Sequence, residues 1–316
     1  METSNSILMF GKQRTGAMLP VAIKFFKDDE TFRHERLFYA DHSNPQFFPE
    51  CYDAKPTCKD HLAYVVMERG DTSLRQWIKT GGHSAAGQRA KAHVKAILAD
   101  IGEGLRGLHS HGLVHGDVKP ENVLFFTRSH RWKLIDFATW SKVDESTVPS
   151  YSLRYSAPEV VTAAAAGKPL ASRPAADMWS FGMVMWECLT GEHMLADYKD
   201  EEVTAMLTGQ SPMPFEDDPS LWQVIKEEPA RRLLHALLQR KPNFRWEVTR
   251  VLDNAFFREG EDTVMAYRKF QAISEAQGAV LNKLGEVSSK VCVYIYILVR
   301  LLLWFVGIMV HLILWW

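Results

Sequence analysis

The sequence predicts an α+β protein with two lobes, a small strand-rich lobe followed by a larger helical one, and then a separate apolar helix. Three observations lead to this prediction. Short apolar runs broken by turns fill residues 6–64, whereas residues 73–257 repeat apolar side chains at helical spacing. Residues 291–316 are almost wholly apolar and follow a polar stretch, residues 261–290.

The composition is that of a near-neutral chain with enough apolar residues for a substantial core. Of its 316 residues 47% are hydrophobic, and 37 Lys and Arg stand against 38 Asp and Glu. No block of basic residues occurs, so nucleic acid is not an expected partner. The spacing of Cys51, Cys58 and His61 fits no short zinc motif, which favours reduced thiols. The first apolar stretch is too short for a secretory signal, so we expect the two lobes to face the cytosol.

Each lobe has a leading helix that the apolar spacing predicts. In the small lobe, residues 28–40 place Phe32, Glu35 and Tyr39 on one helical face. In the larger lobe, residues 92–109 form an apolar stripe with the helical period. The alanine-rich residues 163–169 are expected to form a local insertion.

Residues 115–122, His-Gly-Asp-Val-Lys-Pro-Glu-Asn, carry the most informative chemistry. The segment resembles the catalytic loop of protein kinases. The resemblance implies that Asp117 orients an acceptor hydroxyl and receives its proton, and that Lys119 neutralises a moving phosphoryl group. It also implies that Asn122, in the same loop, holds a metal ion. The Lys-Pro-Glu-Asn ending of the segment is more similar to serine/threonine kinases than to tyrosine kinases.

Residues 134–138, Leu-Ile-Asp-Phe-Ala, resemble the metal-binding segment of the same family. A short apolar strand that ends in Asp136 would place a carboxylate at the rim of a cleft, where it could bind the Mg²⁺ that bridges ATP phosphates. Phe137 would pack inward and hold that aspartate in place.

The resemblance also implies an ATP site upstream. Residues 21–24, Val-Ala-Ile-Lys, are similar to the strand that carries the phosphate-binding lysine, so Lys24 would pair with Glu35. Residues 64–70 resemble the hinge between the lobes. The nucleotide-contacting residues that the resemblance implies are Lys24, Glu35, Ala22, Met67, Glu68, Gly70 and Leu124.

Further segments resemble structural parts of the family in the family's order. Residues 156–159, Ser-Ala-Pro-Glu, are similar to the end of the activation segment, where Glu159 would pair with Arg245. Asp177 would accept backbone hydrogen bonds from the catalytic loop. Ser152 would steady that loop, and residues 252–257 resemble the closing helix. Taken singly, each of these residues could be an ordinary surface or capping residue.

Together these motifs imply a bilobal protein-kinase fold over residues 1–260. The small antiparallel-sheet lobe would cover about 6–66 and the larger helical lobe about 71–258. The implied activity is transfer of a phosphoryl group from ATP, with Mg²⁺, to serine or threonine hydroxyls of proteins. The sequence leaves the oligomeric state and the particular substrate open.

Three departures from the family pattern bear on activity. We expect residues 7–10 to be the second strand of the family sheet, so the first strand and the glycine loop are expected to be missing from this sequence, either because the chain is naturally truncated or because its start was assigned too late. Gly116 stands where many kinases carry an arginine that pairs with an activation-loop phosphate, so we expect another mode of control. Ala138 replaces a glycine, which restricts the backbone. The alternative to an active enzyme is a pseudokinase scaffold that binds partners or nucleotide without catalysis.

Residues 291–316 are expected to form a transmembrane helix, with residues 261–290 as a helical stalk. Arg300 is the one permanently charged residue in this span. At about 1.5 Å per residue, a helix of this length can cross a hydrocarbon core of about 30 Å. The position of the span predicts a tail anchor, with the lobes facing the cytosol and the organelle undetermined.

Overall fold

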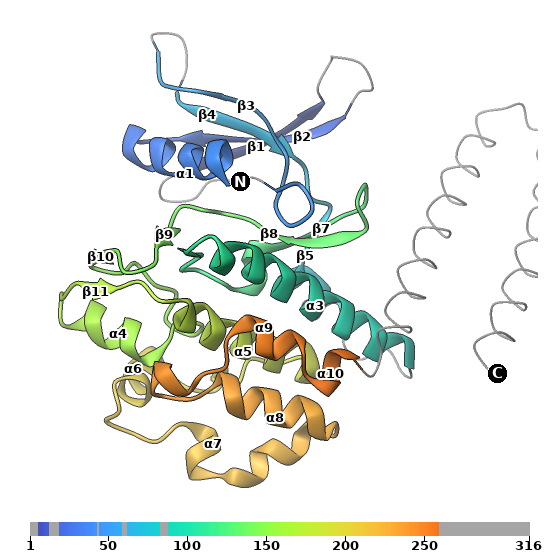
Figure 1. Cartoon of the computed structure of the whole chain (residues 1–316), viewed down its shortest axis with the longest axis vertical. Helices are drawn as coiled ribbons and strands as arrows, with labels where there is room; N and C mark the ends of the chain where they lie inside the picture. Colours follow the sequence, from blue (N-terminus) through green and yellow to red (C-terminus); the bar gives the residue numbers. More distant parts are fainter. Residues whose placement is uncertain (1–5, 13–18, 43, 59–61, 83–87, 259–316) are drawn as a thin grey trace, which may run out of the picture. The chain divides into compact units, whose positions relative to one another are not determined.

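The computed structural model describes residues 6–12, 19–42, 44–58, 62–82 and 88–258. All of them belong to one compact unit, Met1–Val264. Figure 1 shows this unit as a sheet with one helix above a larger, mainly helical part. The α+β bilobal arrangement predicted from the sequence is therefore present.

The small lobe contains a four-stranded antiparallel sheet in the order β1-β2-β4-β3. Its strands are β1 (Ser6–Lys12), β2 (Pro20–Phe26), β3 (Cys51–Lys55) and β4 (Tyr64–Glu68). The expected strand at residues 7–10 is confirmed as part of β1, and among the described residues β1 forms one edge of the sheet. Opposite residues of an antiparallel pair point to the same face, so this register decides which side chains of β1 share a face with Ala22 and Lys24.

Helix α1 (Asp29–Asp41) packs on this sheet and is stabilised by its own first turn. The Asp28 carboxylate accepts a hydrogen bond from the Thr31 amide at 2.7 Å, which caps the helix. Two acidic residues in the first turn favour the positive end of the helix dipole. The buried face of α1 consists of Phe32, Glu35, Phe38 and Tyr39.

The chain leaves β4 through a short connection and enters the large lobe. There β5 (Thr72–Ser73), β7 (Val123–Phe126) and β8 (Arg131–Leu134) form a small sheet in the order β5-β7-β8. The segment after β8 forms two short antiparallel pairs with other parts of the lobe. Strand β9 (Ser141–Lys142) pairs with β6 (Leu113–Val114), and β10 (Ser146–Thr147) pairs with β11 (Leu170–Ala171). Residues 163–169, the predicted insertion, include the last residues of α4 (Pro158–Ala165) and end just before β11.

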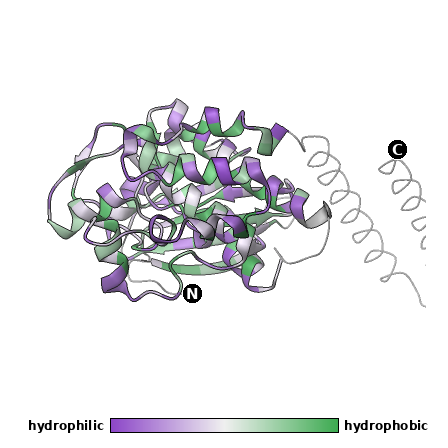
Figure 2. Cartoon of the chain, turned by 90° about the horizontal axis from the view of Figure 1, so that it is seen from below, coloured by the Kyte–Doolittle hydropathy of each residue, from purple (hydrophilic) through white to green (hydrophobic). Residues whose placement is uncertain are grey.

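Helices form the remainder of the large lobe around a buried central helix. In α5 (Pro174–Thr190) every residue from Asp177 to Cys188 is buried, so this helix is the core of the lobe. In Figure 2 hydrophilic and hydrophobic stretches alternate along the helices, as expected where one face packs on a core. The other helices are α2 (Leu74–Lys79), α3 (Gln88–Ser110), α4 (Pro158–Ala165), α6 (Asp200–Leu207), α7 (Pro214–Asp217), α8 (Glu228–Leu237), α9 (Val248–Leu252) and α10 (Ala255–Arg258), with 3₁₀ turns at Pro120–Asn122, Pro219–Val224 and Pro242–Phe244.

Two expectations about the C-terminal part have different outcomes. The single closing helix expected at residues 252–257 is wrong, because α9 ends at Leu252 and α10 begins at Ala255. The Asn254 side chain accepts a hydrogen bond from the Phe256 amide at 2.9 Å, which starts the new helix. The expected stalk and membrane helix, residues 261–316, lie outside the described residues. Within the described part of the chain, no helix has the length and apolarity needed to cross a bilayer.

Candidate active site

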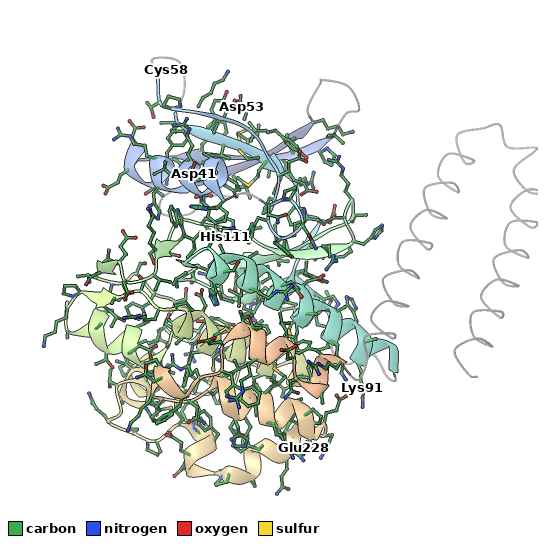
Figure 3. All side chains as sticks on the ribbon, in the orientation of Figure 1. Asp41, Asp53, Cys58, Lys91, His111 and Glu228 are labelled. Carbon is green, nitrogen blue, oxygen red and sulfur yellow. The ribbon has the colours of Figure 1, made fainter. Side chains whose placement is uncertain are left out.

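Lys24 on β2 brings together two carboxylates from different elements. Its Nζ lies 2.6 Å from Glu35 Oε2 on α1 and 2.7 Å from Asp136 Oδ1, which follows β8. The predicted pairing of Lys24 with Glu35 is therefore present. Figure 3 gives the orientation, with Asp41 at the end of α1 in the small lobe and His111, after α3, in the large lobe.

The pKa values of the three groups follow from burial and mutual attraction. Burial alone would lower the pKa of Lys24, but the two carboxylates outweigh it and raise that pKa. Burial raises the pKa of Glu35 to about 6, although Lys24 opposes this. Burial would also raise the pKa of Asp136, but the Lys24 ammonium lowers it below its usual value. The lysine is thus firmly charged, and Glu35 is the carboxylate that can gain a proton near neutrality.

Asp136 is held by its own backbone and by its neighbour. Its φ is 64°, a left-handed conformation that is uncommon outside glycine. Phe137 is fully buried, stacks on Phe38 with ring centroids 3.5 Å apart, and contacts Phe48 edge-on. As predicted, the phenylalanine packs inward, and it ties Asp136 to α1 through aromatic contacts.

Asp117 lies at the centre of a hydrogen-bonded group. Its carboxylate is 2.6 Å from Lys119 Nζ and accepts hydrogen bonds from Ser152 Oγ at 2.7 Å and Asn122 Nδ2 at 2.9 Å. Lys119 also donates to Ser152 at 2.9 Å. Ser152 therefore contacts the loop as predicted, and the expected base and the expected phosphate-neutralising lysine are adjacent.

Asp177 holds the loop at residues 115–122 through that loop's backbone. Its two carboxylate oxygens accept hydrogen bonds from the backbone amides of His115 and Gly116, each at 2.9 Å, as predicted. His109 Nε2 lies 2.9 Å from the same carboxylate. Burial would raise the pKa of Asp177, but these hydrogen bonds and the histidines lower it. The aspartate is therefore a charged anchor for the loop.

The predicted nucleotide-contacting residues meet where the lobes join. Ala22 is paired with Met67 across β2 and β4, and both are largely buried. Gly70 lies so close to Leu124 that an added Cβ would be 2.6 Å from its Cδ1. The Glu68 side chain instead forms a buried ion pair with Lys133, at 2.7 Å, and the Glu68 backbone amide donates to the Glu50 carbonyl at 2.8 Å, so neither group is left for a nucleotide.

The groups proposed for a metal fit Mg²⁺ by their chemistry. Asp136 supplies a partly exposed carboxylate. Asn122 donates its Nδ2 to Asp117, which leaves the amide oxygen for a cation. Mg²⁺ commonly binds one or two protein oxygens together with substrate phosphates. Among the described residues no group of three or more His, Cys, Asp or Glu side chains is arranged for a metal.

The end of the activation segment is held by the ion pair predicted from the sequence. Arg245 donates through both terminal nitrogens to the two oxygens of Glu159, each at 2.6 Å. Its side chain is completely buried. This two-pronged geometry secures the start of α4.

Sequence reasoning did not find three further features near the site. Arg75 on α2 contacts Glu187 and Tyr155 and lies 2.7 Å from Glu121 in the catalytic loop. The side chains of His34 and Trp140 each form a hydrogen bond with the backbone oxygen of the other residue. The guanidinium of Arg69 lies over the Phe10 ring, 4.7 Å from the ring centroid. The alternation of β1 could have indicated Phe10. The other two contacts join segments far apart in the chain, and nothing in their local sequence signals them.

The arrangement described above is that of a phosphotransferase, with an ion-paired lysine, a hydrogen-bonded aspartate and two side chains that could hold a metal ion. The sequence model of a family described as protein kinase domain matches residues 20–257. The chain therefore belongs to the protein kinase family.

Several serine/threonine kinases are similar to this chain. Serine/threonine-protein kinase MPS1 of Saccharomyces cerevisiae is 29% identical over 217 residues, 63% of this chain and 27% of that protein. Ribosomal protein S6 kinase alpha-1 of Homo sapiens is 34% identical over 221 residues, 68% of this chain and 27% of that protein. Mitogen-activated protein kinase kinase kinase 13 of Mus musculus is 38% identical over 112 residues, 34% of this chain and 11% of that protein. The chain thus matches only about a quarter, or less, of the length of these relatives.

Proposed function

We propose that this chain transfers the γ-phosphoryl group of ATP to serine or threonine hydroxyls of proteins. The observation that carries the proposal is the joining of Lys24, Glu35 and Asp136 by ion pairs of 2.6 and 2.7 Å. This cluster combines one residue from each of three elements and keeps the lysine charged for phosphates. Similarity to serine/threonine kinases supports the choice of acceptor.

In this proposal each residue has one task. Asp117 orients the acceptor hydroxyl and takes its proton, while Lys119 stabilises negative charge on the moving phosphoryl group. Asn122 and Asp136 would hold Mg²⁺, which neutralises phosphate charge when bound. Lys24 pairs with the phosphates, and Glu35 keeps it in place.

The adenine would lie between Ala22 and Leu124, against the backbone of the segment that joins the lobes. Ala22 belongs to β2 and Leu124 to β7, so the two side chains come from different lobes. Met67 would close the back of this space, and the Gly70 backbone would supply hydrogen bonds.

The second candidate is a scaffold that binds nucleotide or protein partners without transfer. It is favoured by the outer edge of β1, which no other strand covers among the described residues. The two candidates differ in whether phosphate leaves the nucleotide.

A phosphoryl-transfer assay distinguishes the kinase from the scaffold. It uses labelled ATP, the full chain in detergent and a generic protein acceptor. We expect transfer that falls by about 10²–10⁴ in Asp117→Asn, the usual contribution of a positioned base. Asp53→Asn, an exposed change on β3, is the matched control. Nucleotide binding without transfer in the unaltered chain would favour the scaffold, and transfer that survives Asp117→Asn would contradict the assigned role.

We further propose that residues 291–316 anchor the chain in a membrane, with the lobes on the cytosolic side. The support is the apolar composition of this span, in which Arg300 alone is permanently charged. After alkaline carbonate extraction, the full chain is expected in the membrane pellet and a chain ending at Arg258 in the supernatant. Release of the full chain into the supernatant would contradict the anchor.

A further inference from the structure

A reciprocal contact connects helix α1 with the segment that follows Asp136. His34 Nε2 lies 2.8 Å from the backbone oxygen of Trp140, and Trp140 Nε1 donates to the backbone oxygen of His34 at 3.0 Å. Because a carbonyl oxygen can only accept, the His34 Nε2 must carry the proton. The two rings are stacked, with centroids 4.9 Å apart and an interplanar angle of 17°.

This contact lies next to both carboxylates of the Lys24 cluster. His34 immediately precedes Glu35 on α1, and Trp140 follows Asp136 in the same short segment. Glu35 and Asp136 in turn meet on Lys24. Helix α1 is therefore connected to the large lobe both through His34 and Trp140 and through Lys24. If α1 moves away from the large lobe, the contact between His34 and Trp140 or the ion pairs on Lys24 must break.

Packing alone does not determine the position of Trp140. The indole is 7% exposed, yet it borders a cavity of about 350 Å³ that His34, Gly116 and Thr139 also line. The ring also contacts Phe38 and His42, so ring packing and the two hydrogen bonds together set its position.

The segment beyond Trp140 is tied to the large lobe and does not depend on α1. Strand β9 pairs with β6, and β10 pairs with β11. Ser141 Oγ donates to Ser172 Oγ at 2.8 Å, and Arg173 pairs with Asp144 at 2.5 Å. Trp140 is thus fixed on the side of the large lobe, whereas α1 depends on contacts such as the one with His34.

We propose that His34 and Trp140 form a latch that holds α1 against the segment that follows Asp136 and so positions Glu35 and Asp136 on Lys24. Both are positioning residues, because they act through the two carboxylates. The proposal rests on the proposed function for its effect on catalysis, but the latch itself is a property of the nucleotide-free chain.

Three variants of the full chain separate the hydrogen bonds from the ring contact. His34→Phe keeps a stacked ring and removes the donor, and Trp140→Phe does the same for the indole N–H. His34→Gln keeps a side-chain N–H donor and removes the ring. His42→Phe is the matched control, because the His42 ring also contacts the indole, at 5.7 Å.

The primary measurement is amide hydrogen exchange of residues 29–41 without nucleotide, alongside the melting temperature. We expect exchange to accelerate roughly five- to tenfold in His34→Phe and in Trp140→Phe, as loss of one hydrogen bond implies. His34→Gln should restore slow exchange, and His42→Phe should leave it unchanged. Unchanged exchange in both Phe variants at positions 34 and 140, or equal exchange in His34→Gln and His34→Phe, would overturn the latch. A melting temperature close to that of the unaltered chain shows that each variant is folded.

Phosphoryl transfer gives the second measurement. Variants with faster exchange should show a lower kcat/KM for ATP, and His34→Gln should recover it. If the unaltered chain transfers no phosphate, the proposed function fails while the exchange data still decide on the latch. If it transfers phosphate and the exchange of residues 29–41 does not depend on the latch residues, only the latch fails.

Discussion

Glu35 is a carboxylate whose side chain is only 1% exposed and which still carries an ion pair with Lys24. Burial raises its pKa to about 6, from 4.5 for an exposed glutamate. The chemistry needs the ionised form, because a neutral carboxyl group cannot hold the Lys24 ammonium by charge.

We therefore expect kcat/KM for ATP to decrease as the pH falls below about 6, since this ratio reports groups of the free enzyme. The loss should not result from unfolding, because a group with a raised pKa in the folded state stabilises the fold as the pH falls through that pKa. Measurement of kcat/KM between pH 5 and 8 tests this. Glu35→Gln should have a low rate and no step near pH 6, and an unchanged step in that variant would assign it to another group.

Gly116 occupies a position that a side chain would strain. Its φ is 82°, and an added Cβ would lie 2.7 Å from the backbone oxygen of Thr139. The glycine that departs from the family pattern therefore fits its surroundings here. The expectation that activation-loop phosphate is not the main control stays a prediction.

Gly112 provides a matched comparison, because its φ is 68° and no heavy atom of the described residues lies within 4 Å of an added Cβ. Gly112→Ala should cost only the conformational term, about 1–2 kcal/mol in the free energy of unfolding. Gly116→Ala should cost at least about 1 kcal/mol more, because Thr139 must also move. Urea denaturation of both variants measures the difference, and equal midpoints would show that the loop moves freely.

At the scale of elements, the register of β1 decides which face of the sheet its one aromatic side chain occupies. Phe10 lies opposite Ala22, and Leu8 lies opposite Lys24, so Phe10 and Leu8 share the face of two residues that are predicted to contact nucleotide. Phe10 is 49% exposed, and Met9, on the other face, is 55% exposed.

We expect Phe10→Ala to weaken ADP binding by about 1–2 kcal/mol, the usual value of an aromatic ring stacked on a base. Met9→Ala removes a similarly exposed apolar side chain from the opposite face and should leave the affinity unchanged. Isothermal titration calorimetry of the two variants compares the faces directly. Equal affinities would mean that Phe10 does not contact the base.

The elements show where local sequence is sufficient and where it is not. Helix α1 was predicted within one residue at each end, because Asp28 caps it and its apolar spacing is regular. The division between α9 and α10 was not predicted, since it depends on the Asn254 side chain competing with the helical pattern. Strand β11 depends on its partner β10, which is distant in the chain.

At the scale of the whole molecule, the candidate nucleotide site takes residues from both lobes. Ala22 and Lys24 belong to β2, whereas Asn122, Leu124 and Asp136 belong to the large lobe. A ligand that bridges the lobes stabilises the folded state as a unit, because it binds that state alone.

At a Mg·ADP concentration of 100 times Kd, we expect stabilisation of about 2.7 kcal/mol. This corresponds to an increase in Tm of about 5–10 °C for a domain of this size. Differential scanning fluorimetry measures the shift. Lys24→Met should reduce it strongly and Lys55→Met, an exposed change on β3, should not. A full shift in Lys24→Met would remove the lysine from the phosphate site.

The sequence by itself determined the two-lobed fold and the principal pairs of the site. Lys24 with Glu35, Glu159 with Arg245, and Asp177 with the loop at residues 115–116 could all be predicted, because each lies in a motif whose residue types and order are distinctive. The tertiary structure alone decided that Lys24 also contacts Asp136, that Arg75 joins Glu121 and Glu187, and that His34 meets Trp140. The physical reason is that such contacts depend on distances between elements, which packing sets and which no local pattern of residues encodes.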